Sequence, residues 1–184
     1  MDANAVTTHF SALAAGDLAV VRVDGPGVCR ECGRFENLLL DIEKRGFASI
    51  LLDLSSCGRV DSTFAGVLLR LAERINRRPP GAKPLQVAVT GANRSIIELL
   101  DTLCLDDLFD RVDLPPAPDL APLDIADRDR SKEEIMALSL DGHERLAALN
   151  DENARRFAQL LPLLRQELAR AGQRRAGQPD PADS

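Results

Sequence analysis

Residues 60–69, VDSTFAGVLL, come shortly after the apolar run SILLDL at 49–54. A continuous apolar run of this length is typical of a strand buried on both faces, and the apolar spacing from Phe64 onward predicts a helix over 63–77. Asp61, Ser62 and Thr63 therefore lie where a buried strand leads into a helix. A helix start carries unpaired backbone N–H groups and the positive end of the helix dipole, which accommodate a phosphate. Ser62 or Thr63 is thus a candidate regulatory switch rather than a candidate catalyst.

The alternation of strands and helices extends on both sides of this segment. Hydrophobic periodicity predicts strands over 5–10, 18–23, 49–54 and 85–89, a short strand or extended tail at 108–112, and helices over 33–45, over 63–77 and after Asn93. Such alternation implies right-handed crossovers and a mainly parallel sheet. The predicted fold class is α/β, with a mixed or parallel sheet of four to five strands, helices packed on it and a C-terminal helical extension.

The rest of the chain is expected to lie outside this domain, which covers residues 1–113. Prolines in 114–130 predict a linker, because proline at this density prevents regular structure. A helical arm is predicted over 131–171, opening with a capping box formed by Ser131 and Glu134 and kinked or divided at Pro162. Residues 172–184, rich in Gly, Gln, Arg and Pro, are expected to be disordered.

Composition narrows the classes of function. The chain has 184 residues, a net charge of −6, 3% aromatic residues and no Trp or Tyr. An acidic chain without a basic face or stacking aromatics is a poor candidate for binding nucleic acid or an anionic membrane. No apolar run is long enough to span a bilayer, and the N-terminus lacks the basic start of a secretion signal. We therefore expect a cytoplasmic protein.

Few residues suggest catalysis or metal binding. Cys29 and Cys32 have the spacing used by zinc and redox sites, but no second such pair follows, so incidental thiols are the favoured interpretation. His143 has no second ligand in reach and is expected on the surface of the arm. With no histidine near the hydroxyls and no Gly-rich phosphate loop, we expect no enzyme, no catalytic residue, no metal and no cofactor.

The order of elements, with Asp-Ser-Thr opening the second helix, resembles the STAS domain, a family that includes bacterial anti-sigma factor antagonists. The resemblance rests on residues 51–54, 60–63, Gly66 and 91–109, and spans roughly residues 5–113. It implies a partner anti-sigma factor that is also a serine kinase. The unphosphorylated protein binds this partner, and the phosphorylated protein is released. Ser62 matches the acceptor, Asp61 the adjacent acid, and Thr63 a second hydroxyl.

One residue departs from the family pattern. Phe64 occupies a position where family members usually carry glycine, whereas Gly66 is kept. A bulky residue there would change how closely a partner approaches the loop. The residues expected to contact the partner are Asp53, Arg59, Asp61, Ser62, Thr63, Phe64 and Gly66.

Each of these residues also has a purely structural interpretation. Ser62 or Thr63 could serve as the helix N-cap, and Asp61 could either orient the serine hydroxyl or cap the helix. Asp53 fits a loop cap better than a part in phosphate transfer, and Arg59 fits a solvated arginine better than a phosphate partner. The alternative to a phosphorylated module is a constitutive STAS scaffold or adaptor subunit of a signalling complex. Under either function, the arm is expected to fold onto the domain or to form a homodimer.

Overall fold

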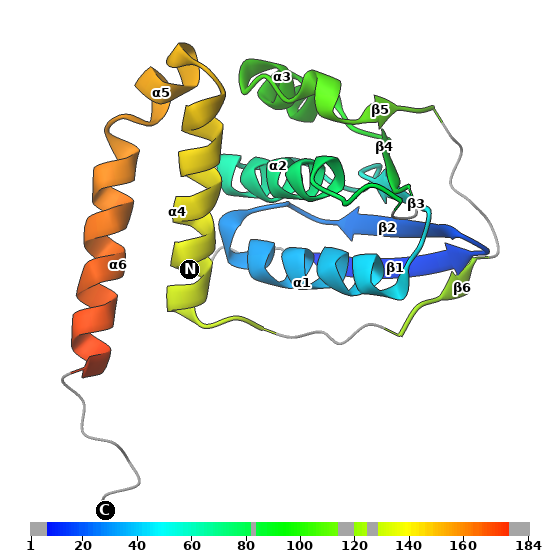
Figure 1. Ribbon diagram of the computed structural model, residues 1–184, viewed down its shortest axis with the longest axis horizontal. Helices are drawn as coiled ribbons and strands as arrows, with labels where there is room; N and C mark the ends of the chain where they lie inside the picture. The colour runs from blue at the N-terminus through cyan, green and yellow to red at the C-terminus, as the bar shows by residue number, and fades with distance from the viewer. Residues whose placement is uncertain (1–6, 82–83, 114–119, 125–128, 177–184) are drawn as a thin grey trace, which may run out of the picture.

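A six-stranded mixed sheet forms the centre of the molecule in this computed structural model, which describes residues 7–81, 84–113, 120–124 and 129–176 (Figure 1). The strands are β1 (His9–Ala15), β2 (Leu18–Asp24), β3 (Ser49–Asp53), β4 (Gln86–Thr90), β5 (Asp110–Arg111) and β6 (Ala121–Pro122), in the order β5-β4-β3-β2-β1-β6. The four strands from β2 to β5 are parallel, and β1 is antiparallel to both its neighbours. The predicted α/β class is confirmed. The strand count rises to six because two two-residue strands complete the edges.

Three helices connect the parallel strands: α1 (Cys29–Arg45), α2 (Ser62–Asn76) and α3 (Arg94–Thr102), the last followed by the 3-10 turn η1 (Asp106–Leu108). Their apolar faces pack on the sheet because each helix places apolar residues at helical spacing. The core is mainly aliphatic, as the composition predicts. Its two largest fully buried side chains, Phe35 of α1 and Phe64 of α2, stack with ring centroids 4.4 Å apart.

The first strand differs from the prediction. It runs over 9–15 rather than 5–10, and residues 5 and 6 lie outside the described residues. Pairing with β2 extends from His9–Asp24 to Ala15–Leu18, so the strand runs up to residue 15. The tight turn is made at Gly16, where φ is +57° and glycine avoids the strain that a side chain brings.

The predicted linker also contains a strand. Ala121 and Pro122 pair with Ala14 and Leu13, so part of 114–130 is regular structure. Pro122 is tolerated because β6 lies at the edge of the sheet, where its missing N–H breaks no ladder. Residues 114–119 and 125–128 lie outside the described residues.

The arm consists of α4 (Lys132–Leu149), α5 (Asp151–Phe157) and α6 (Leu160–Ala176). The capping box of Ser131 and Glu134 is confirmed. The helix divides before Pro162, which lies in the first turn of α6, where a proline costs no hydrogen bond. α6 continues to Ala176, so the prediction of disorder is wrong for 172–176, and 177–184 lie outside the described residues.

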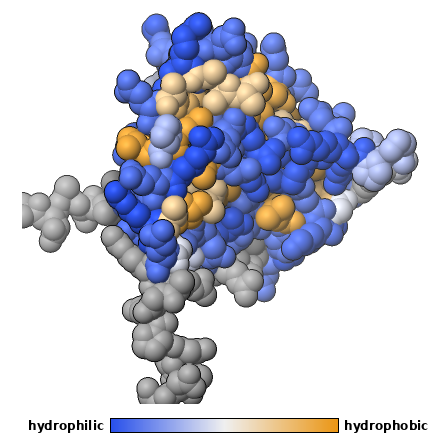
Figure 2. Space-filling model, turned by 60° about the vertical axis from the view of Figure 1, so that its left-hand side comes forward, coloured by the Kyte–Doolittle hydropathy of each residue, from blue (hydrophilic) through white to orange (hydrophobic). Residues whose placement is uncertain are grey.

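The arm folds back onto the domain. α4 crosses the ends of α1 and α2, and α6 packs along α4 on the side away from the sheet (Figure 1). The face on this side of the molecule is mainly hydrophilic with small separate hydrophobic patches (Figure 2). Within the described part of the chain, none of the helices has the length and apolar character needed to cross a membrane.

Candidate functional site

The loop between β3 and α2 starts at Asp53, the last residue of the central strand. The Asp53 carboxylate is 8% exposed and accepts hydrogen bonds from the Ser55 backbone N–H at 3.0 Å and the Ser55 hydroxyl at 2.6 Å. Its other oxygen pairs with Arg22 Nε at 3.2 Å. Asp53 therefore shapes the start of the loop, in agreement with the loop-cap interpretation.

Residues after β4 support the same loop from the side. The Asn93 amide donates to the carbonyl oxygens of Cys57 at 3.1 Å and Gly58 at 2.9 Å. Gly91 has φ +67°, and a Cβ on it would lie 2.1 Å from Ser55 Oγ. Only glycine therefore fits at this contact. The loop after β3 is thus in direct contact with the start of the 91–109 segment, on which part of the family resemblance rests.

Asp61 is the N-cap of α2 and also caps α1. One carboxylate oxygen accepts from the Phe64 backbone N–H at 2.9 Å, and the other accepts from the Cys29 N–H at 2.7 Å. A carboxylate at two helix N-termini satisfies unpaired N–H groups and interacts favourably with both helix dipoles. The prediction that Ser62 or Thr63 caps the helix is wrong, because these residues occupy its first two positions.

Ser62 is half-buried, and its hydroxyl meets the arm. Ser62 Oγ lies 2.8 Å from Nε2 of His143 in α4, and His143 Nδ1 lies 2.7 Å from the Ser139 carbonyl oxygen. A carbonyl only accepts, so Nδ1 carries the hydrogen, and in this tautomer Nε2 accepts from the Ser62 hydroxyl. The His143 ring also packs edge-on against Phe157, with centroids 5.0 Å apart.

The next residues of α2 are buried more deeply. Thr63 is 5% exposed, and its hydroxyl lies 3.2 Å from Ser139 Oγ. Phe64 is completely buried against Phe35, and Gly66 lies under α4. Most of the residues expected to contact a partner are buried, namely Asp53, Thr63, Phe64 and Gly66. Arg59 is exposed, and Asp61 and Ser62 are partly so.

Gly66 of α2 and Gly142 of α4 are the point of closest approach between the two helices. A Cβ on Gly66 would lie 2.8 Å from Gly142 Cα, and a Cβ on Gly142 would lie 3.3 Å from Gly66 Cα. The two backbones therefore touch without intervening side chains. This packing explains why small residues, Ser139 and Gly142, fill the buried face of α4 between Leu138 and Leu146.

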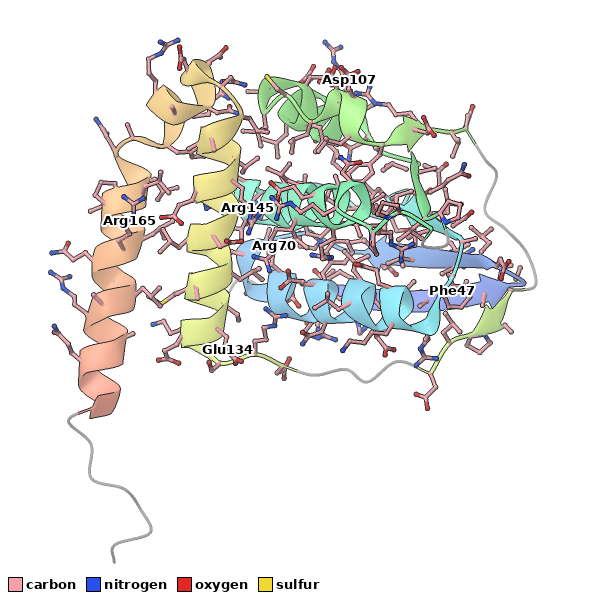
Figure 3. All side chains as sticks on the ribbon, viewed as in Figure 1. Phe47, Arg70, Asp107, Glu134, Arg145 and Arg165 are labelled. Carbon is pink, nitrogen blue, oxygen red and sulfur yellow. The ribbon has the colours of Figure 1, made fainter. Side chains whose placement is uncertain are left out.

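Charged pairs fasten α4 further along α2. Arg70 contacts both Asp141 of α4 and the buried Glu36 of α1, and Arg145 of α4 contacts Asp141 and Glu73 of α2 (Figure 3). Burial alone raises the pKa of Asp141, but the hydrogen bonds from Arg145 and Arg70 outweigh it and bring the pKa below its ordinary value. The same hydrogen bond stabilises the charged guanidinium of Arg145, so it raises the pKa of Arg145 above its ordinary value.

Three residues of the site were missed or misplaced by sequence reasoning. His143 is 3% exposed rather than on the surface, and a histidine does lie beside the hydroxyls. Ser139 and Gly142 were not singled out. The available signal was their spacing: residues 139, 142 and 143 share one helix face, and this face is polar although it lies between two leucines.

The paired cysteines lie in the first turn of α1 and are not joined in a disulfide. Burial raises the pKa of the Cys32 thiol far above its ordinary value, which keeps it protonated and unreactive. Among the residues that the structure describes, no cluster of three or more His, Cys, Asp and Glu side chains could hold a metal ion.

The STAS domain family matches residues 9–120. No match was found among curated proteins. A solved structure of a candidate anti-sigma factor antagonist from Thermotoga maritima has a TM-score of 0.51 at 19% identity, covering 57% of this chain and 86% of that one. An anti-sigma factor antagonist from Mycobacterium paratuberculosis gives 0.48 at 14% identity, covering 57% and 85%. At this level of identity the likeness concerns the fold.

Proposed function

The chain belongs to the STAS domain family, and we propose that it is a regulatory protein-binding module of the anti-sigma factor antagonist type. The loop from Asp53 to Ser62 and the start of α2 form its docking surface. The partner is a protein resembling an anti-sigma factor with serine kinase activity. Phosphorylation of Ser62 by this partner ends the complex.

The observation that carries the proposal is the position of Ser62 in the first turn of α2, directly after the cap Asp61. Ser62 is the partly exposed residue of the pair, whereas Thr63 is 5% exposed and engaged with Ser139. A phosphate on Ser62 would lie at a helix N-terminus, which tolerates negative charge. We therefore assign the acceptor role to Ser62 and a structural role to Thr63.

The negative charge of a phosphate on Ser62 would release the partner. A phosphate adds about −1.5 to −2 charges at neutral pH, next to the carboxylate of Asp61. A complex that buries this loop must then desolvate two neighbouring negative groups, which is costly without paired cations. Because about 1.4 kcal/mol changes an affinity tenfold, a modest penalty is enough to release a partner.

A second candidate function is a constitutive scaffold or adaptor that binds through the same loop without chemistry. The hydrogen bond from Ser62 to His143 favours it, because the hydroxyl already has a structural partner. Under this alternative, Ser62→Asp would not selectively release the partner.

Affinity purification with the full chain identifies the partner, whose binding is then measured with the purified protein. We expect Ser62→Ala to bind at least as well as wild type, and Ser62→Asp to bind at least about tenfold more weakly. Ser95→Asp is the matched control, because Ser95 is exposed in the first turn of α3. Equal binding by Ser62→Asp and Ser95→Asp would favour the scaffold.

A further inference from the structure

The arm covers the part of the proposed docking surface that the start of α2 forms. We propose that α4 is an internal competitor for this surface: the docked arm closes over Ser62 and Thr63, and a partner or kinase reaches Ser62 only after α4 has moved away. This inference rests on the proposed function for its consequences. The closure itself is a property of the chain alone.

The hydrogen bonds show what closure does to the two hydroxyls. Ser62 donates to His143 at 2.8 Å, and Thr63 lies 3.2 Å from the Ser139 hydroxyl, so both face α4. A kinase needs the acceptor hydroxyl aimed at its nucleotide and at its own base. With α4 docked, the Ser62 hydroxyl hydrogen is already committed to an imidazole of the same chain.

The Gly66–Gly142 contact makes the closure specific. Because the helices touch backbone to backbone, α4 has one position that satisfies both the glycine contact and the hydroxyl pairs. A larger residue at 142 cannot be accommodated unless α4 moves away from α2. Position 142 is therefore one at which a substitution can lift the arm without altering the docking surface.

The chemical character of the contact suits a reversible closure. α4 buries only two large apolar side chains, Leu138 and Leu146, among its buried residues. Much of the remaining contact is polar, and the pairs Arg70–Asp141 and Arg145–Glu73 are partly exposed. Leu138 and Leu146 join the hydrophobic core of the domain, so release of the arm would expose these two leucines together with the polar groups.

Phosphorylation and arm docking oppose each other at Ser62. Phosphoryl transfer from ATP forms a bond from Ser62 Oγ to the γ-phosphorus, breaks the bond from that phosphorus to ADP, and passes the hydroxyl proton to a base of the kinase. A phosphoryl group does not fit between Oγ and an imidazole nitrogen 2.8 Å away, so α4 must shift. By linkage, whatever weakens arm docking favours phosphorylation, and phosphorylation weakens docking.

A thiol placed at position 62 measures the closure directly. In the full chain carrying Ser62→Cys, the alkylation rate of the introduced thiol by iodoacetamide is followed by peptide mass spectrometry. We expect Gly142→Leu to raise this rate about tenfold or more, because a minor open state of such an equilibrium is populated at about 0.1–10%. Gly172→Leu is the matched control, since a Cβ on Gly172 meets no atom within 4 Å. Unchanged rates with Gly142→Leu would overturn the closure.

A second pair of variants distinguishes release of the arm from misfolding of the chain. Arg145→Glu places a third carboxylate beside Glu73 and Asp141 and should also raise the rate. Combining it with Glu73→Arg restores opposite charges and should return the rate toward wild type. Faster alkylation without this rescue, or with loss of the sheet signal in circular dichroism, would contradict a specific release of the arm.

Binding of the purified partner separates the two proposals. If the partner binds Gly142→Leu more tightly than Gly172→Leu, both the closure and the shared surface are supported. If alkylation accelerates but neither variant binds the partner, the closure stands and the proposed function fails. If both bind equally while alkylation accelerates, α4 does not compete with the partner, and the inference is overturned.

Discussion

Ser62 Oγ and His143 Nε2 are 2.8 Å apart although 81 positions separate them in the sequence. This pair joins the first turn of α2 to the middle of the C-terminal arm. The proposed phosphorylation site is therefore in contact with a segment that lies outside residues 9–120, the part of the chain that the family matches.

The Ser62–His143 hydrogen bond should contribute measurably to stability. We expect His143→Ala to lower the free energy of unfolding by about 1–3 kcal/mol, because it removes a buried ring and leaves hydroxyl and carbonyl partners unpaired. The coupling energy between the two residues comes from urea unfolding of Ser62→Ala, of His143→Ala and of the double variant. We expect a coupling energy of about 0.5–1.5 kcal/mol. Additive effects would mean that the hydrogen bond is not formed. His9→Ala, on an exposed residue, is the control.

Substitutions of Asp61 should lower the free energy of unfolding in two steps, because its two oxygens cap two helices. Asp61→Ala removes both caps and is expected to cost about 1–3 kcal/mol. Asp61→Asn keeps one acceptor oxygen and should cost roughly half as much. Chemical denaturation measures both, with Asp107→Ala on an exposed acid as the reference. Equal losses for the two variants would contradict two separate caps, because the amide oxygen of Asn can still accept from one of the two N–H groups.

Phe64 should act through the core rather than through a partner. Because it is completely buried and stacked on Phe35, Phe64→Ala is expected to cost about 3–5 kcal/mol of unfolding free energy. Phe47→Ala, which truncates a partly exposed ring, should cost clearly less. A stable Phe64→Ala protein that lost only partner binding would instead indicate direct contact with the partner.

Asp141 should make stability depend on pH. Its native pKa lies below the unfolded value of about 3.9, so the native protein binds fewer protons than the unfolded chain in that range. The contribution of Asp141 is therefore complete above about pH 5 and disappears as the pH falls through the native pKa. The difference in unfolding free energy between wild type and Asp141→Asn should shrink from about pH 6 to about pH 3. A difference that does not change with pH would contradict the ion pairs with Arg70 and Arg145.

Local pattern was sufficient to predict most of the domain. The buried run at 49–54 and the apolar stripe from Phe64 placed β3 and α2 within one or two residues, because strand and helix periods are read directly from neighbouring residues. The helix start after Asn93 and the Ser131–Glu134 capping box are equally local and are confirmed.

Long-range contacts were not predictable in this way. β6 is two residues long and forms only because β1 offers a free edge. The burial of His143 depends on a helix crossing fixed by two glycines 76 positions apart, numbered 66 and 142. A solvated surface histidine and a buried hydrogen-bonded one have the same local sequence, so only the tertiary fold distinguishes them.

Mapping the phosphate after incubating the full chain with its purified kinase-like partner and ATP tests the proposed switch most directly. Tandem mass spectrometry should find the modification on Ser62, with none on Thr63, and the Gly142→Leu protein should be modified faster than the Gly172→Leu protein. A partner complex that forms and persists in ATP with Ser62 unmodified would contradict the switch.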